Sequence, residues 1–293
     1  MNLSTKKKNQ PWFFSFNCFA PHHPFDPPAN FLEKYNPDDM PLPKAKPNEL
    51  ESKTTYQQLD AQFAHNDPNS YDIKEMTDRD KREITAAYYA MIELIDKQVG
   101  RMINALKETE QLENTIIIFM SDHGEMLGDH GFYLKGPHFY DEAVRVPLIF
   151  SCKDLIKTNL RANCLVELVD IAPTLLDATG LDIPNYIQGK SLLPILNGKK
   201  TADHHRDYVF SEYYNSWTHK HAYGSMLRTV NEKIIVYHGT NQGELYNLKC
   251  DPNEYENLWD DPSHTSNKLR LMKACFDASV FTMDPSPPRL GPF

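Results

Sequence analysis

Several features that would place this chain in a specialised class of protein are missing from it. No stretch of about 18 apolar residues occurs, so the sequence predicts no membrane-spanning helix. The formal net charge of −9 leaves no surplus of positive charge to neutralise phosphates, which argues against a dedicated nucleic-acid binder. The N-terminus lacks the order of a signal peptide, so the default expectation for the compartment is the cytoplasm.

Cysteine is scarce and carries no pattern. The five cysteines are odd in number and show no Cys-x-x-Cys spacing, which argues against a disulfide framework and a structural zinc site. We expect them to be buried, reduced thiols. The 293 residues suffice for one large domain or two smaller ones, and 40% apolar with 24% charged residues is typical of a globular protein.

The first two thirds of the chain show the pattern of an α/β domain. Thr115–Met120 is a short, β-branched run that predicts a buried strand, and Val144–Phe150 predicts the next one. Before them, a helix capped by Thr77 or Asp78 is predicted, which would make half of a βαβ unit. A second helix is expected over Val166–Ala178, ended by Gly180. The helical spacing before the first strand is carried by Ile84, Tyr88, Met91, Ile92, Ile95, Val99, Met102, Ile103 and Leu106.

The ends of the chain differ in character from this part. Trp12–Asn17 predicts a buried strand, and Pro37–Asn69 predicts a long irregular excursion with one helical turn at most. After residue 203, short strands and a terminal helix near Asn267–Phe276 predict a small antiparallel sheet with a helix. These strands are expected at Tyr208–Phe210, Met226–Arg228, Lys233–Tyr237 and Glu244–Leu248. We therefore predict two domains, residues 1–203 and 204–293.

The strongest chemical signal follows the predicted strand at 115–120. Asp122 and His123 lie where that strand ends, and ligands bind at this edge of α/β sheets. A carboxylate suits Ca²⁺, Mg²⁺ or Mn²⁺, whereas an imidazole favours a transition metal, so the pair predicts a metal site without fixing the ion. The alternative is a polar turn in which Asp122 caps a helix. Lys135, just beyond, could hold the charge of an anionic substrate.

Further histidines stand near these positions in the sequence. His22 and His23, held between Pro21 and Pro24, could donate hydrogen bonds to an oxyanion or a leaving group. His138 is a weaker candidate. Asp129 and His130, in the second Asp-His-Gly, are weaker in the same way, since a histidine near a site more often supports it than reacts.

Taken in order, these segments resemble the sulfatase family of the alkaline-phosphatase-like superfamily, with similarity running from Trp12 almost to the C-terminus. The segments that carry the resemblance are Phe13–Phe16 with Ala20–Pro24, Asn114–Gly131, Lys135–Pro147, Asp170–Leu176, Gln188–Leu192 and Glu244–Leu258. The resemblance implies a partial alkaline-phosphatase-like sheet-and-helix core (an α/β fold) with the small C-terminal antiparallel sheet and helix.

The resemblance also implies an activity, the hydrolysis of small-molecule or carbohydrate sulfate esters with a divalent cation. The family's usual ion is Ca²⁺, with Mg²⁺ and Mn²⁺ as alternatives. By matched position, Asp122 and His123 would bind the metal, and Lys135 and His22 would act on the sulfate and the leaving oxygen. His23 and His138 are predicted to contact the substrate. Cation, lysine and histidine would together stabilise the negative charge of the transition state.

One motif of the family is not matched. Its nucleophile is made from Cys or Ser in the pattern Cys/Ser-x-Pro/Ala-x-Arg, but Cys18 is followed by His22 and Cys250 by Glu254 where arginine is required. We therefore expect the chain to be the C-terminal portion of a sulfatase catalytic domain. Two alternatives stay open, a non-catalytic remnant and a phosphodiester or phosphonate ester hydrolase of the same superfamily.

Overall fold

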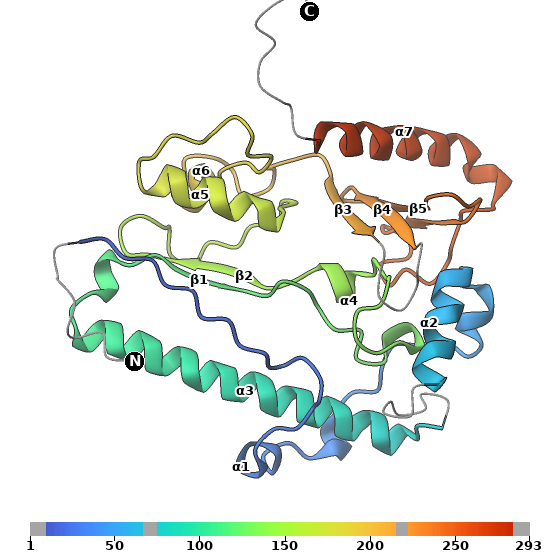
Figure 1. Ribbon diagram of the computed structural model, residues 1–293, viewed down its shortest axis with the longest axis horizontal. Helices are drawn as coiled ribbons and strands as arrows, with labels where there is room; N and C mark the ends of the chain where they lie inside the picture. Colours follow the sequence, from blue (N-terminus) through green and yellow to red (C-terminus); the bar gives the residue numbers. More distant parts are fainter. Residues whose placement is uncertain (1–9, 67–74, 215–221, 284–293) are drawn as a thin grey trace, which may run out of the picture. The chain divides into compact units, whose positions relative to one another are not determined.

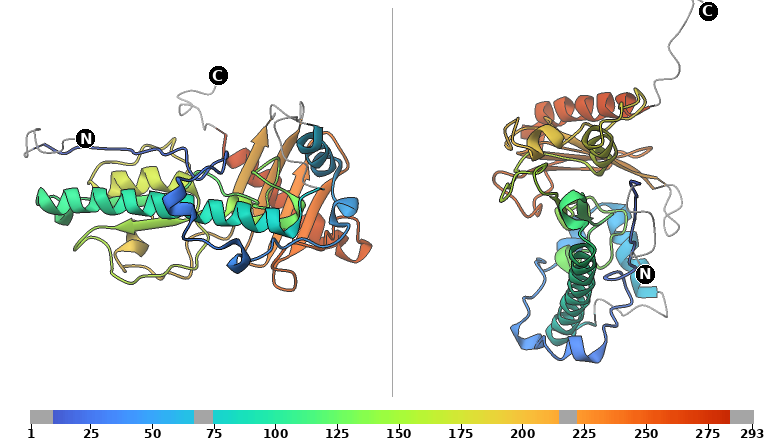
Figure 2. Two further views of the ribbon diagram at one scale, coloured as in Figure 1. Left: turned by 90° about the horizontal axis from the view of Figure 1, so that it is seen from below. Right: turned by 90° about the vertical axis from the view of Figure 1, so that its left-hand side faces the viewer.

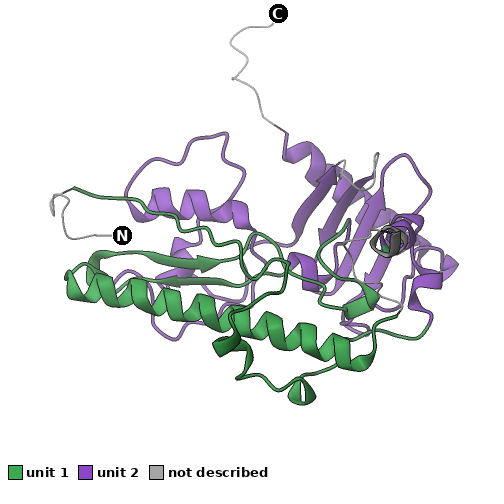
Figure 3. Ribbon diagram, turned by 60° about the horizontal axis from the view of Figure 1, so that its bottom comes forward, with its two compact units in different colours: residues 1–47, 61–136, 145–153 green, residues 48–60, 137–144, 154–293 purple. Residues whose placement is uncertain are grey.

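The computed structural model describes residues 10–66, 75–214 and 222–283. The chain forms two compact units, shown in Figure 3. The first unit contains Met1–Pro47, Ala61–Gly136 and Arg145–Lys153, and the second contains Asn48–Asp60, Pro137–Val144 and Asp154–Phe293. The domain boundary between residues 203 and 204 stays a prediction. In the part of the chain that the structure describes, no helix has both the length and the apolar character needed to cross a bilayer.

The first unit is organised around the long helix α3, Asp78–Glu108, which confirms the helix predicted from the apolar spacing. Thr77 is its N-cap. The Thr77 hydroxyl accepts a hydrogen bond from the Asp80 N–H at 3.2 Å, and the Asp80 carboxylate accepts one from the Thr77 N–H at 2.8 Å. This reciprocal pair is a capping box, which satisfies two amides that the helix itself cannot.

The first unit contains the two strands predicted in the middle of the chain. β1 (Ile117–Met120) and β2 (Leu148–Ser151) confirm the two strand positions, and they pair antiparallel, with Ile117 opposite Ser151 (Figure 1). The predicted half of a βαβ unit, a helix followed by a strand, is present as α3 and β1, and among the described residues no strand precedes α3 to complete the unit. The expected burial is wrong, since Phe119 is 38% and Met120 41% exposed. Within the described residues this sheet has two strands.

The strand predicted at Trp12–Asn17 is not formed. Residues 11–19 have no regular structure, and their aromatic side chains are exposed, Phe13 by 82% and Phe19 by 71%. A strand needs a neighbour for its backbone groups. Among the described residues no backbone hydrogen bond joins 12–18 to another segment, and the contact made by Trp12 is a side-chain hydrogen bond from Nε1 to Gln111 Oε1 at 2.9 Å.

The excursion predicted at Pro37–Asn69 holds more helix than expected, although its last three residues lie outside the described ranges. It contains the 3₁₀ turns η2 (Pro37–Asp39) and η3 (Glu49–Ser52) and a twelve-residue helix, α2 (Thr55–Asn66). The apolar pattern of the sequence does not predict this helix, because the residue that attaches it to the rest of the fold is polar. Buried Gln57 donates from Nε2 to the Tyr140 hydroxyl at 2.8 Å. Further short helices elsewhere in the chain include α1 (Ala29–Leu32), η4 (Leu112–Asn114), η5 (Asp129–Gly131) and α4 (Asp141–Val144).

The second unit contains the predicted antiparallel sheet, which is confirmed. Its order is β3-β4-β5-β6, and helix α7 (Thr265–Phe281) packs on β3, β4 and β5 (Figure 2). The strands are β3 (Val209–Tyr214), β4 (Tyr223–Arg228), β5 (Glu232–Tyr237) and β6 (Gly243–Asn247). The core between sheet and helix consists of Leu227, Ile234, Leu245, Trp259, Leu271, Cys275 and Ala278.

The cysteines are all free, but only Cys275 is buried, and burial raises the pKa of its thiol to about 12. Cys18 and Cys250 are exposed, so the expectation of buried thiols is wrong for these two.

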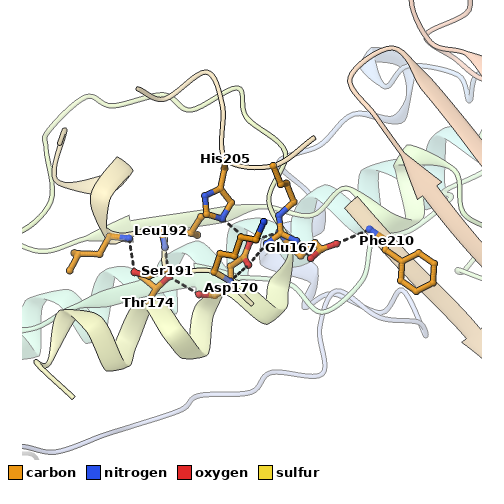
Figure 4. Close-up of polar contacts among 10 residues, drawn as sticks. Glu167, Asp170, Thr174, Ser191, Leu192, His205 and Phe210 are labelled. Atoms are coloured by element: carbon orange, nitrogen blue, oxygen red, sulfur yellow. Dashed lines mark hydrogen bonds and ion pairs between the residues drawn. The ribbon is translucent and has the colours of Figure 1, made fainter. Parts of the chain in front are cut away.

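Buried polar contacts join the segments on either side of residue 203 within the second unit. The fully buried Asp170 carboxylate accepts the backbone N–H groups of Glu167 at 2.9 Å and Lys190 at 2.8 Å and pairs with Arg206 (Figure 4). Because Asp170 holds the Glu167 amide, the chain forms the 3₁₀ turn η6 (Leu168–Asp170) before α5 (Ile171–Ala178), and the predicted helix begins five residues late. Helix α6 (Leu193–Leu196) follows.

Strand β5 of the second unit carries a lysine, Lys233, that has no solvent exposure. Lys233 donates from Nζ to the Phe139 carbonyl at 2.9 Å and to Asp141 Oδ1 at 2.8 Å, and it forms an ion pair with Glu254. Lys233 and Glu254 are 0% and 2% exposed. Burial raises the pKa of Glu254 to about 7, and the positive charge of Lys233 opposes this rise only in part.

This carboxyl group should make folding stability depend on pH. The folded state keeps the Glu254 proton up to about pH 7, whereas the ordinary pKa is 4.5, so between these values the folded state holds more protons. We expect the free energy of unfolding to fall by on the order of 3 kcal/mol as the pH rises through this window. Urea unfolding of the wild type and of Glu254→Gln from pH 4.5 to 8 isolates this contribution; parallel pH profiles would contradict it.

Candidate functional site

The candidate site lies in the first unit, where β1 ends at Met120. The chain turns sharply here, with the Ser121 hydroxyl donating to the His123 carbonyl at 2.7 Å. His123 Nδ1 lies 2.8 Å from the Gly124 carbonyl. Because a carbonyl only accepts, Nδ1 carries the proton and Nε2 keeps its lone pair for a ligand. The neighbouring Asp122 carboxylate is exposed and makes no hydrogen bond or ion pair with the described residues.

The proline-bounded loop brings two more histidines to this place. His22 Nδ1 is 2.9 Å from the His23 carbonyl, so it donates, and Nε2 is left to accept from the Lys135 ammonium at 2.9 Å. The His22 ring lies 4.3 Å from that of His23 and 5.8 Å from that of His123, centroid to centroid. The structure thus brings His22, His23, His123 and Lys135 together from segments far apart in the sequence.

This cluster carries the chemistry of an anion site. The Lys135 ammonium supplies a full positive charge, and the imidazoles supply further polar groups around it. Partial burial lowers the pKa of His23, and the nearby His22 and Lys135 lower it further. Such a group stays neutral at pH values where an ordinary histidine begins to take up a proton.

Sequence reasoning missed one member of the cluster, Glu125. One of its carboxylate oxygens accepts the backbone N–H groups of Leu127 and Leu134. Burial raises its pKa, while these two hydrogen bonds and the nearby His22 and His123 act in the opposite direction. No spacing rule identifies a carboxylate that bonds to an amide nine residues away, so the sequence offered no signal for it.

The other histidines and the aspartate predicted near the site make contacts outside the cluster. His138 belongs to the second unit, where its buried side chain places Nε2 3.0 Å from Asp60 Oδ2. Asp129 accepts the Lys44 N–H at 2.6 Å, and the His130 N–H donates to the Lys44 carbonyl at 2.9 Å. These two hold the 43–45 segment in the first unit. The substrate-binding role of His138 stays a prediction.

The donors present fit part of a divalent cation's shell. The Asp122 carboxylate has no other partner among the described residues, and His123 keeps Nε2 open, so both suit a metal. Within the described ranges, however, no group of three or more His, Cys, Asp or Glu residues could hold an ion. Any further ligands would come from water, a substrate or groups beyond this set.

Two family models and several known proteins match the chain. A family model described as "Sulfatase" matches residues 2–181, and one described as "N-sulphoglucosamine sulphohydrolase, C-terminal" matches residues 128–279. An N-acetylglucosamine-6-O-sulfatase of Bacteroides thetaiotaomicron is 32% identical over 237 residues, which is 78% of this chain and 41% of the relative. An arylsulfatase of Clostridium perfringens is 31% identical over 264 residues, 87% of this chain and 51% of the relative.

Solved structures give the same fold. The phosphonate monoester hydrolase of Silicibacter pomeroyi superposes with a TM-score of 0.81 at 28% identity, covering 91% of this chain and 55% of that one. The protein BT4656, solved in complex with its substrate D-glucosamine-2-N,6-O-disulfate, has a TM-score of 0.73 at 24% identity, covering 93% and 66%. The chain spans about half the length of the curated relatives it matches.

Proposed function

This chain belongs to the sulfatase family, and on that premise we propose that it takes part in the hydrolysis of sulfate esters, with carbohydrate sulfates as the substrate class. One observation carries the proposal: Lys135 Nζ lies 2.9 Å from His22 Nε2, with His123 beside them at the end of β1. The relatives named for sulfated glucosamine support the substrate class.

Each residue has a separate task in the proposal. Lys135 would bind a sulfate oxygen as a point charge and stabilise the negative charge that develops on the leaving oxygen. His22, held by its Nδ1–H bond to the His23 carbonyl, keeps the ammonium in place. Asp122 and His123 would hold the divalent cation, proposed as Ca²⁺ with Mg²⁺ or Mn²⁺ as alternatives. When bound, that cation would polarise the S–O bonds.

The proposal concerns anion binding and charge stabilisation. The family's nucleophile motif is not matched in these 293 residues, so no bond-breaking step is assigned to this chain. The phosphonate monoester hydrolases are a second candidate class, because the superposition with one of them reaches a TM-score of 0.81. Sulfate and phosphonate share a tetrahedral anionic shape, and Lys135 would serve either.

The test is binding of the bare anion. We expect Lys135→Ala to weaken binding of inorganic sulfate about 10- to 100-fold, since a hydrogen bond to a charged group contributes about 1.5–3 kcal/mol. Calorimetric titration of sulfate into the wild type and the variant gives both affinities. Titrating methylphosphonate in parallel separates the two candidate classes by which anion binds tighter.

The control replaces a lysine of the same unit that has no place in the site. Lys107, exposed in the last turn of α3, is suitable, and Lys107→Ala should bind sulfate as the wild type does. Equal affinities for wild type and Lys135→Ala would refute the proposed anion site.

A further inference from the structure

The loop between the candidate metal ligands and the lysine is closed on itself. The Met126 N–H donates to the Leu134 carbonyl at 2.8 Å, and the Gly128 N–H donates to the Phe132 carbonyl at 2.7 Å. Two leucines of this loop have left-handed backbones, Leu127 at φ +47° and Leu134 at φ +65°. Leucine rarely adopts this conformation, because its Cβ crowds the carbonyl oxygen. Something in the structure must therefore hold the loop in this shape.

The Glu125 side chain holds the loop in this shape where its two arms meet. A single oxygen, Oε1, accepts the backbone N–H of Leu127 at 3.1 Å and also that of Leu134. These are the two leucines of the loop whose backbones are left-handed. A single oxygen that accepts both N–H groups fixes the distance between the two amides. One side chain thus joins both arms of the loop.

The two arms carry the two halves of the candidate site. Glu125 follows His123 by two residues, and Leu134 directly precedes Lys135, whose Nζ reaches His22 Nε2 at 2.9 Å. We propose that Glu125 is a positioning residue that fixes Lys135 beside His22 and thereby shapes the anion site. This inference rests on the proposed function for its consequence in sulfate binding, although its structural part can be tested alone.

Two alternatives compete with the positioning role of Glu125. The loop also buries Met126 and Phe132, at 0% and 1% exposure, and these apolar anchors could hold Lys135 without Glu125. Alternatively, Glu125 could act through its negative charge alone. Side-chain length separates geometry from charge. Glutamine keeps the accepting oxygen at the same distance without the charge, whereas aspartate keeps the charge but is one methylene too short to reach both amides.

The first measurement is the ¹⁵N signal of His22 Nε2, which reports directly on the Lys135 contact. Lys135→Ala provides the signal of a lost contact. We expect Glu125→Asp to move the Nε2 signal toward that value and Glu125→Gln to leave it near the wild-type value. The amide of Leu134 should exchange with solvent at least tenfold faster in Glu125→Asp than in Glu125→Gln.

The second measurement is sulfate affinity by calorimetry. Glu125→Gln should bind within about threefold of the wild type, and Glu125→Asp should bind at least tenfold more weakly. The matched controls are Glu83→Gln and Glu83→Asp, since Glu83 is a surface glutamate of α3 in the same unit, and both should bind as the wild type.

The outcomes distinguish the inference from the function on which it rests. If Glu125→Asp keeps the wild-type His22 signal, the apolar anchors suffice and the inference is overturned. If Glu125→Gln loses sulfate and Glu125→Asp keeps it, charge is responsible and the inference is again overturned. If the wild type binds no sulfate but the His22 signal shifts as expected in Glu125→Asp, the positioning role stands and the proposed function fails.

Discussion

Replacing Lys233 by methionine is expected to lower the free energy of unfolding by about 3–5 kcal/mol, the usual result of removing one partner from a buried ion pair. The substitution preserves the side chain's length and leaves Asp141, Glu254 and the Phe139 carbonyl without the ammonium that they share. Urea unfolding at pH 8 measures the loss directly. At pH 5 the loss should be smaller, because Glu254 can then take up a proton and become neutral.

The control for this experiment is an exposed lysine of the same unit. Lys273 on α7 pairs with Asp277 while 75% of its side chain is exposed. Lys273→Met should change the free energy of unfolding by no more than about 0.5 kcal/mol, as is usual for surface substitutions. A loss below about 1 kcal/mol for Lys233→Met at pH 8 would mean that apolar burial compensates for the ion pairs, as happens in some proteins.

Gly189→Ala is the second substitution from which we expect a large loss, about 3 kcal/mol or more, in the upper part of the range for single substitutions. A Cβ at this position would lie 2.0 Å from the Val169 carbonyl oxygen and 2.9 Å from the Asp170 nitrogen. The backbone would have to move away, and the Lys190 N–H would then leave the buried Asp170 carboxylate (Figure 4). Thermal unfolding by circular dichroism measures the effect.

Gly100→Ala is the matched control, because nothing lies within 4 Å of the Cβ that it would add to the interior of α3. Alanine is the better helix former, so this variant should gain about 0.5–1 kcal/mol. If Gly189→Ala melted at the temperature of the wild type, the backbone near Val169 would be able to move away from the added Cβ without loss of stability, which would contradict the prediction.

Sequence patterns predicted the helices and strands whose signals lie within the element itself. The apolar spacing and the Thr77 cap predicted α3, and the short runs separated by turn residues after residue 203 predicted all four strands of the β3–β6 sheet. The helix α2 was missed because its anchor, Gln57, is a polar residue bonded to Tyr140 across 83 positions of sequence. The strand predicted at Trp12–Asn17 failed for the opposite reason, since its apolar run finds no partner among the described residues.

The candidate site could be predicted as residue types but not as contacts. Asp122, His123, Lys135 and the two loop histidines were identified from motif and resemblance, and the structure brings His22, His123 and Lys135 together. Their roles in binding and catalysis stay predictions. Glu125 escaped notice because its importance lies in which amides it reaches, and this depends on the left-handed turns at Leu127 and Leu134.

The sheet of the second unit has a consequence for how this unit assembles. Each of its strands pairs with the next one along the chain, so the chain entropy lost in closing each hairpin is small. The contact between Lys233 and Asp141, by contrast, closes a loop of 92 residues. The contact between Gln57 and Glu244 closes a loop of 187 residues. Most of the entropic barrier to forming this unit therefore falls on bringing the 48–60 and 137–144 segments to a sheet whose hairpins can form from local contacts alone.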